Sequence, residues 1–595
     1  MNGKQHTYNM GIVGNCSFMA YIDMHAEVKW MCMPRFDSSF LFGSLLDSEK
    51  GGTFRISPTG DIIQHRQYYL ENTNVLCTEF ECSDGAFRVT DFAPRFYQND
   101  RYFRPLMLLR KIEPLEGRPM VRVVCRPVGE YGRALPEVLL GSNHIRYMNI
   151  GPHIRLTTDI SLNNIVDEKA FVLSEPRYLL FSCELPLESG LTDTFESFLK
   201  KTVSYWREWV KTTSIPSIYQ EAIIRSSLVL KLHQYEDTGG IIASGSMSLP
   251  EFDQSGRNWD YRYCWMRDTY YTLYALNSIG HFEESQKYFQ YIENIIATEK
   301  ARIQPLYSIT GEKVLTETIT GLKGYMDNNA PVRLGNEAYT HIQNDVYGQV
   351  LVSLMPLYVD KRLSIHSANK PLQIIHFLLD KIEETLYTPD AGLWEFRNSM
   401  QLHCYTFLFH WAGSRAALKI GTEMNDESLI KKARNLILLS SEQIEKCYSA
   451  EKKAYTQAIG SDHMDASCLK LVSMGYLDPN SAKAHDHITA IERELKTENG
   501  FIYRYRHEDD FGRPESTFLV CAFWYAEALA CIGRLDDANK TLENLIRTSN
   551  HLGLFSEDVG LDGSQWGNFP QTYSHVGLMN AVFRLARKLD KPLYG

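Results

Sequence analysis

The chain has 595 residues, so two or three domains are expected from its length alone. Hydrophobic residues make up 44% and charged residues 23%, and the formal net charge of -10 is spread along the chain without acidic or basic blocks. This balance argues against a nucleic-acid-binding surface, which would need clustered basic residues. No apolar run is long enough to cross a bilayer, and the N-terminus lacks a secretory pattern, so a cytoplasmic location is expected.

The first third of the chain has the pattern of short β-strands. Segments rich in β-branched and aromatic residues cover 75–84, 86–94 and 119–128, and turn residues separate them. Many short strands at this spacing are typical of packed antiparallel sheets. We therefore predict an N-terminal antiparallel β-sandwich domain over residues 1–190.

The rest of the chain has the pattern of helices. Residues 191–215 repeat apolar side chains at intervals of three and four, which predicts a linker helix. From residue 216 to 595 about twelve helical segments follow one another, and six helical hairpins in one domain favour an (α/α)6 barrel. The predicted fold is therefore a β-sandwich over residues 1–190 followed by an (α/α)6 barrel over residues 216–595.

The connections between these helices alternate between short and long. The long ones are rich in Trp, Tyr, Arg and acidic residues and cover roughly 236–266, 299–340, 386–401, 450–461, 496–514 and 549–570. Every second connection of such a barrel lies at the same end, so the six elaborated loops are expected to form one site there.

The first long loop contains RNWDYRYCWMRD, which ends in Arg267 and Asp268. A guanidinium group beside a carboxylate matches the neighbouring hydroxyls of a sugar. The third contains LWEFR, in which Glu395 follows Trp394. An indole against a carboxyl group disfavours the charged form and raises its pKa, as a general acid requires.

The last long loop contains GLFSEDVG, in which Glu557 and Asp558 are candidates for a general base. Polar residues that follow it are expected to help hold a water molecule: Asn568, Gln571, Tyr573 and His575. The run Glu508, Asp509 and Asp510 in the fifth loop is interpreted as a solvated acidic turn.

Together with YMDNNAPVRLGN, NDVYGQV and GNFPQTYSH, these segments resemble glycoside hydrolase family 15, the glucoamylase and trehalase family. The N-terminal segments GIVGNCSFMAYID and VKWMCMPRFDS resemble the opening of its bacterial and archaeal members, so the resemblance covers about residues 8 to 588. It implies a β-sandwich joined to an (α/α)6 barrel and hydrolysis with inversion at the anomeric carbon.

The resemblance also implies roles for particular residues. Glu395 matches the general acid, Glu557 the general base, and Arg267 with Asp268 the pair that binds the non-reducing glucose. Further contacts with the sugar are expected from Trp259, Trp265, Trp394, Arg397, Tyr573 and His575. The family often has a Ser-Lys pair where this chain has Tyr405 and Thr406. That difference lies near the leaving-group side and leaves the substrate open.

The first prediction is an inverting exo-acting hydrolase that releases β-glucose from maltooligosaccharides or a similar α-glucan. The alternatives are an α,α-trehalase and an α-1,6-glucosidase acting on isomaltose. An inverting disaccharide phosphorylase is a rival enzyme class, and a carbohydrate-binding protein without catalysis is a rival outside enzymes. The expected partner is a small-molecule or oligosaccharide glucoside, with no nucleic acid, membrane, metal or cofactor, and the sequence does not indicate an oligomeric state.

Overall fold

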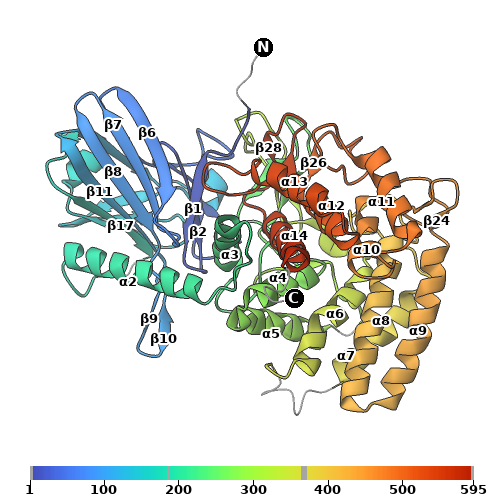
Figure 1. The fold of residues 1–595 in the computed structure, drawn as a ribbon. Coiled ribbons are helices and arrows are strands. Elements are labelled where there is room, and N and C mark those ends of the chain that lie inside the picture. Colours follow the sequence, from blue (N-terminus) through green and yellow to red (C-terminus); the bar gives the residue numbers. More distant parts are fainter. Residues whose placement is uncertain (1–4, 184–186, 300, 364–371, 591–595) are drawn as a thin grey trace.

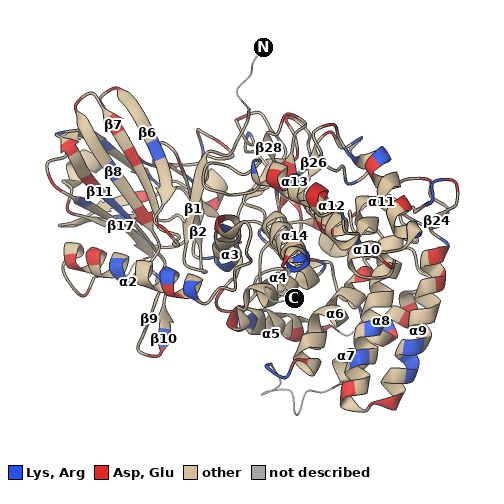
Figure 2. Ribbon diagram, viewed as in Figure 1, with Lys and Arg blue, Asp and Glu red and all other residues tan. Residues whose placement is uncertain are grey.

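The computed structural model describes residues 5–183, 187–299, 301–363 and 372–590. An antiparallel β domain is followed by a helical domain, which confirms the predicted fold class (Figure 1). Among the described residues, no helix is both long enough and apolar enough to span a bilayer. Charged residues of both signs lie along the outward-facing sides of α2 (Leu191–Lys211) and α9 (Glu427–Glu445) (Figure 2).

The β domain is built on three main antiparallel sheets. The largest has eight strands in the order β13-β14-β15-β17-β11-β8-β7-β6. Its strands are β6 (Ile62–Tyr69), β7 (Leu76–Cys82), β8 (Gly85–Phe92), β11 (Met107–Gly117), β13 (Glu137–Leu140), β14 (His144–Met148), β15 (Ile154–Thr158) and β17 (Arg177–Cys183). A second sheet has the order β16-β12-β5, formed by β5 (Thr53–Pro58), β12 (Met120–Arg126) and β16 (Phe171–Val172). The third joins β1 (Met10–Gly14), β2 (Met19–Asp23), β3 (Val28–Cys32) and β4 (Phe40–Phe42).

Side chains alternate along the central strands of the large sheet, and these strands have buried residues on both faces. On β11, Leu108 and Ile112 belong to the main core, whereas Met107 and Leu109 face a separate apolar cluster. Phe195 of α2 completes that cluster. The predicted linker helix therefore also covers one face of the sheet (Figure 1).

Within the part of the C-terminal domain that the structure describes, twelve helical segments form two concentric rings (Figure 1). The inner ring consists of α4 (Thr269–Ile279), α6 (Asp345–Val359), α8 (Cys404–Met424), α10 (Lys470–Ser473) with its preceding 3-10 turn (Ala466–Leu469), α12 (Leu519–Cys531) and α14 (Thr572–Leu589). Successive inner helices contact each other, and α14 packs on α4 to close the ring. The outer ring consists of α3 (Gln220–His233), α5 (Phe282–Thr298), α7 (Gln373–Thr385), α9, α11 (Ala482–Leu495) and α13 (Leu535–Ile546).

The sequences of the helices explain their places in the two rings. Every residue of α12 is buried, which suits an inner helix with neighbours on all sides. Helix α13 buries only Ala538, Leu542 and Leu545, which lie on one face at helical spacing, as expected of an outer helix.

Each inner helix is preceded by one of the long connections. We call these loop 1 (234–268), loop 2 (299–344), loop 3 (386–403), loop 4 (446–465), loop 5 (496–518) and loop 6 (547–571). They all lie at the end of the barrel where the inner helices begin. The alternation of long and short connections therefore places six elaborated loops at one end, as the sequence predicted.

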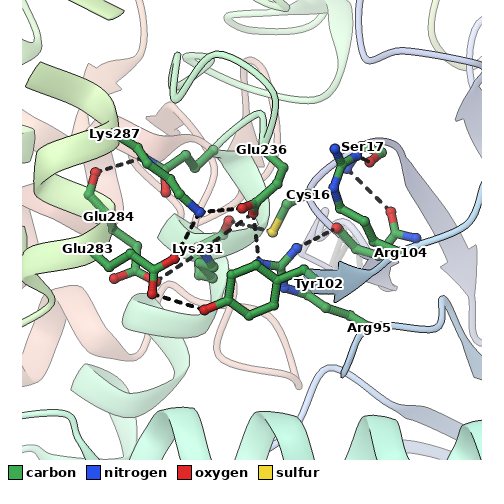
Figure 3. Close-up of polar contacts among 12 residues, drawn as sticks. Cys16, Ser17, Arg95, Tyr102, Arg104, Lys231, Glu236, Glu283, Glu284 and Lys287 are labelled. Atoms are coloured by element: carbon green, nitrogen blue, oxygen red, sulfur yellow. Dashed lines mark hydrogen bonds and ion pairs between the residues drawn. The ribbon is translucent and has the colours of Figure 1, made fainter. Parts of the chain in front are cut away.

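The β domain is joined to the barrel by a buried charged network (Figure 3). Arg95 of the β domain donates to Glu236 of loop 1 at 2.7 Å, and Lys231 of α3 pairs with Glu284 of α5 at 3.0 Å. Lys287 of α5 also donates to Glu236. These charges are nearly all buried, so each requires its partner.

The segment between β3 and β4 also contacts loop 1, but it does not line the cavity described below. Arg35 and Asp37 pair within their own turn at 2.9 Å, and the carbonyl of Ser38 accepts a hydrogen bond from buried Arg262 of loop 1 at 2.8 Å. Arg262 is held in turn by Asp260 at 2.7 Å. Asp260 and Arg262, two charged residues of the RNWDYRYCWMRD motif, therefore stabilise the domain junction rather than bind a ligand.

Candidate active site

A cavity opens where the loops meet, and loops 1, 2, 3, 5 and 6 form its walls with the first turn of α14. Because the inner helices begin here, the partial positive charge of their N-termini favours anionic groups in the cavity. Nine of the ten side chains predicted for the site line it: Glu395, Glu557, Arg267, Asp268, Trp259, Trp265, Trp394, Arg397 and Tyr573.

Glu395 is held in place by hydrogen-bond donors from two other loops. Its Oε1 accepts from the indole of Trp265 at 2.7 Å, from Gln343 at 3.2 Å and from Arg267 at 3.2 Å. The backbone of Glu395 is left-handed, with a φ of 63°, an uncommon conformation for a residue other than glycine. Such strain is often found where a side chain must be aimed at a site.

The indole beside the Glu395 carboxylate is therefore that of Trp265, whereas Trp394 was expected in that place. Trp394 still lines the cavity, but its N–H donates to buried Asp465 of loop 4 at 2.8 Å. Burial raises the pKa of Asp465 to about 6. The contact ties loop 3 to loop 4, which itself contributes no residue to the cavity wall.

Arg267 and Asp268 form the predicted pair at the cavity wall. The guanidinium group donates to Asp268 at 3.0 Å and to the carbonyl of Leu393 at 2.8 Å. Both side chains keep a small exposed fraction, 14% and 13%. Each is thus oriented by its neighbour while it still faces the cavity, as a sugar-binding pair requires.

Glu557 is 1% exposed and is bound by Tyr261, whereas Glu395 is bound by Trp265. Its Oε1 accepts from the phenol of Tyr261 at 2.6 Å, and its Oε2 from the backbone N–H of Asn568 at 3.1 Å. The ring of Tyr261 meets that of Trp265 edge-on, with centroids 5.2 Å apart. Two aromatic residues four positions apart in loop 1 therefore hold the two candidate carboxyl groups.

Two further carboxyl groups surround Glu557. Ligand oxygens of Glu251, Glu557 and Asp558 all lie within 4.8 Å of one another, and all three residues are buried. Burial, followed by the nearby charge of Glu251, raises the pKa of both Glu557 and Asp558. Arg504 of loop 5 donates to Glu251 at 2.7 Å. This is the described acidic group best arranged to hold a cation, although the guanidinium group already supplies positive charge to it.

Sequence reasoning missed Tyr261, Glu251 and Arg504. Tyr261 lies in the same motif as Arg267. Aromatic residues occupy every second position of that motif up to Trp265, and this pattern was a signal that could have identified Tyr261. Glu251 is one carboxyl group in an ordinary Leu-Pro-Glu segment, and nothing local distinguishes it. Only the approach of loops 1, 5 and 6 brings it to Glu557.

The outer wall of the cavity is aromatic and charged. The guanidinium groups of Arg333 and Arg397 lie 4.6 and 4.7 Å from the ring centre of Trp259, and both pair with Glu317. Phe511 meets the same indole edge-on at 5.1 Å. Much of the Trp259 ring is therefore occupied by side chains of the protein, which leaves less of it for a sugar than the sequence suggested.

The acidic turn of loop 5 differs from its expected solvated state. Asp509 accepts from Arg257 at 2.8 Å and lines the cavity, and Asp510 accepts from the backbone N–H of Arg397 at 2.6 Å. The interpretation as a solvated turn was therefore wrong for Asp509, because Arg257 of loop 1 is its partner, whereas Asp510 is exposed as expected.

His575 does not line the cavity, contrary to the expected sugar contact. It is fully buried, accepts from the N–H of Phe555 at 3.1 Å and lies 2.9 Å from the hydroxyl of Ser226. Residues two apart on a helix point to different sides, so Tyr573 faces the cavity and His575 faces away from it. Burial lowers the pKa of His575 well below its usual range.

Asn568 and Gln571 also have structural partners. The side chain of Asn568 donates to the carbonyl of Trp259 at 2.9 Å. Gln571 lines the cavity and caps α14 by accepting from the N–H of Ser574 at 3.2 Å. These contacts fix loop 6 against loop 1 and α14, so Glu557 is presented by a well-anchored loop.

Comparison with known proteins covers both domains. Residues 217–583 match the family model described as glycosyl hydrolases family 15, and residues 4–152 match one described as trehalase-like, N-terminal. A protein of Thermoplasma volcanium named trehalase is 32% identical over 98% of this chain and 93% of its own length. One of Thermoplasma acidophilum, also named trehalase, is 31% identical over 96% and 98%.

A solved structure of a bacterial glucoamylase complexed with acarbose has a TM-score of 0.70 to this chain. The match covers 99% of this chain and 96% of that one at 14% sequence identity, so it shows a shared fold.

Proposed function

The chain belongs to glycosyl hydrolase family 15, and from this premise we propose that it hydrolyses α,α-trehalose into two glucose molecules. The observation that carries the choice of substrate is the similarity of both domains to relatives named trehalase, which spans nearly the full length of each protein. Hydrolysis of trehalose is thus the first candidate function, and the exo-acting release of glucose from longer glucans is the second.

The two carboxyl groups supply the chemistry of inversion. In the proposed reaction, Glu395 gives its proton to the glycosidic oxygen as the bond to the anomeric carbon breaks. Glu557 removes a proton from a water molecule that attacks the same carbon from the other side. Inversion requires room for this water, so carboxyl groups about 6.5–9.5 Å apart are expected. Placement of Glu395 and Glu557 on either side of the Tyr261–Trp265 pair supports this arrangement.

The glucose that receives the water is proposed to lie against Arg267, Asp268 and Tyr573. The hydroxyl of Tyr573 is buried at the cavity wall and has no hydrogen-bond partner among the described residues. A buried hydroxyl without a partner is costly, so a sugar hydroxyl that bonds to it is favoured. Trp265 then offers an aromatic edge beside the reacting centre.

One structural feature favours the second candidate, hydrolysis of maltooligosaccharides. The cavity shares Phe396, Asp509 and Asp510 with a neighbouring open groove, whose lining also includes Gln457 and His507. In the second candidate function, this groove would receive the further sugar units. A disaccharide needs only the cavity itself.

The test is to supply trehalose, maltose, maltotriose and isomaltose separately and to follow glucose release. Trehalose is expected to have the highest kcat/KM. Proton NMR early in trehalose hydrolysis is expected to show one α-glucose and one β-glucose per bond broken, because only the attacked carbon inverts. Release of α-glucose alone would contradict inversion, and a preference for maltotriose would favour the second candidate. Glucose 1-phosphate formed only when phosphate is present would identify a phosphorylase instead.

A further inference from the structure

The three buried carboxyl groups of Glu251, Glu557 and Asp558 form a carboxyl triad. Their exposed fractions are 3%, 1% and 2%, and their oxygens lie within 4.8 Å of one another. Like charges this close in a buried site cannot all be ionised, so at least one member must hold a proton. The positions of the neighbouring donors indicate which one.

The positive charges near the triad face Glu251. Arg504 donates to it at 2.7 and 3.4 Å, and a nitrogen of Arg257 lies 4.0 Å from it. The indole N–H of Trp259 approaches the same carboxylate at 3.3 Å. Both oxygens of Glu251 therefore accept hydrogen bonds, and its charge is balanced, which favours the ionised form.

Glu557 also has a donor for each oxygen, the phenol of Tyr261 and the backbone N–H of Asn568. Asp558 does not. Its Oδ1 accepts from the hydroxyl of Ser516 at 3.1 Å, but its buried Oδ2 has no hydrogen-bond partner among the described residues. An ionised carboxylate with one bare, buried oxygen is strongly disfavoured, whereas a protonated Oδ2 becomes a donor itself.

The bare oxygen of Asp558 lies close to the candidate base. A Cβ atom built on Gly567 would be 2.7 Å from Oε2 of Glu557 and 3.1 Å from Oδ2 of Asp558, so both oxygens face the same glycine. The φ of Gly567 is 72°, which favours glycine at this position. A proton on Oδ2 can therefore point toward another carboxylate of the triad.

We propose that Asp558 retains its proton throughout turnover and Glu251 stays ionised, so that Glu557 alone among the triad exchanges a proton with water. This inference rests on the proposed function, in which Glu557 is the base. The water oxygen bonds to the anomeric carbon while one water proton passes to Glu557, and the leaving oxygen takes the proton of Glu395. The cycle closes when Glu557 releases its proton to solvent and Glu395 takes one up. Asp558 and Glu251 are thus positioning residues.

Other titratable or charged groups face the triad from each element packed around it. These groups are Tyr261 and Arg257 of loop 1, Arg504 of loop 5, Cys521 of α12 and Tyr8 of the N-terminal segment. Burial raises the pKa of Tyr8, Tyr261 and Cys521 well above their usual values, so these three stay neutral. The arginines stay charged. Within the accessible pH range, the proton balance is therefore set by the carboxyl groups.

The first test compares Asp558→Asn with Glu251→Gln through the pH dependence of kcat/KM for trehalose. Glu251→Gln removes a negative charge near Glu557, so the acid limb of the profile should move to lower pH by about one unit. Asp558→Asn replaces one neutral group with another, so it should lose less activity than Glu251→Gln and leave the acid limb in place. An acid limb that moves down equally in both variants would mean that Asp558 is ionised, which overturns the proposal.

The second test does not depend on turnover. The infrared spectrum at pH 7 in D₂O is expected to contain the carbonyl band of an un-ionised carboxylic acid that Asp558→Asn removes and Glu251→Gln keeps. Absence of this band from the parent protein would overturn the proposal even if trehalose is hydrolysed. If no α-glucoside is hydrolysed, the band still tests the protonation of Asp558, so the two failures are distinguishable.

A bound cation is the competing explanation for the triad. Dialysis of the whole protein against EDTA is expected to leave kcat/KM unchanged. A loss of activity that added Mg²⁺ restores in the parent protein but not in Asp558→Asn would assign the triad to a metal and overturn the proposal.

Discussion

The phenol of Tyr261 and the carboxylate of Glu557 are joined by a 2.6 Å hydrogen bond across 296 positions of the chain. The same tyrosine touches Trp265, whose indole holds Glu395. One short segment of loop 1 therefore sets the positions of both carboxyl groups that the proposed reaction uses.

Glu395→Gln and Glu557→Gln should each lower kcat for trehalose by at least ~10²–10⁴-fold, because each removes one proton transfer. Both amides keep the shape of the side chain, so the melting temperature should fall little. Glu557→Gln also removes one of the two ionisable charges that crowd the carboxyl triad, those of Glu251 and Glu557, so this variant should be no less stable than the parent. Either variant with more than a tenth of the parent rate would exclude that glutamate as acid or base.

Tyr261→Phe should lower kcat/KM by ~10–100-fold, since a hydrogen bond to a charged group is lost. The hydrogen bond from Tyr261 lowers the pKa of Glu557. Its loss raises that pKa, so Glu557 stays protonated to higher pH and the acid limb of the profile should move up. Tyr263→Phe is the matched control, because Tyr263 belongs to the same motif but lies outside the cavity wall. A profile unmoved in Tyr261→Phe would contradict this role.

Glu236→Gln should weaken the junction between the domains by about 3–5 kcal/mol, because it leaves buried Arg95 without its carboxylate partner and buried Lys231 with Glu284 alone. Burial acts to raise the pKa of Glu236, but Arg95, Lys231 and Lys287 outweigh it and hold that pKa at about 2. The stability this carboxylate supplies is therefore complete above its unfolded pKa of ~4.3 and is lost as the pH falls toward 2.

Thermal denaturation between pH 2 and pH 7 would test this ionisation. The parent protein should lose thermal stability as the pH falls, and part of this loss should be absent from Glu236→Gln. Glu283→Gln is the control, because Glu283 pairs with Lys287 at a half-exposed position and should matter by less than about 1 kcal/mol. Equal losses of stability in the two variants would argue against a special role for the buried network.

His575→Phe should lower stability rather than affinity for the substrate. The change leaves the N–H of Phe555 without its acceptor and the hydroxyl of Ser226 without its partner, at a cost of about 1–3 kcal/mol for each group. The melting temperature should fall while KM for trehalose changes little. A raised KM at an unchanged melting temperature would restore His575 to the sugar-binding set.

Sequence alone identified the two kinds of domain, the twelve helical segments and the end of the barrel that carries the cavity. These features follow from local periodicity and from the alternation of long and short connections, both of which can be read along the chain. Even the short fourth inner helix was predicted as a helical segment, although only α10 and a 3-10 turn form there. Glu395, Arg267 and Asp268 were found because they lie in long, irregular motifs.

Only the tertiary structure decided which side chains act together. In the structure, His575 faces away from the cavity and Asp509 pairs with a buried arginine. The indole that contacts Glu395 is that of Trp265 rather than Trp394. It also brought Glu251 to Glu557 from another loop. The physical reason is that burial, charge pairing and the direction in which a side chain points depend on neighbours hundreds of positions away, and no local pattern encodes them.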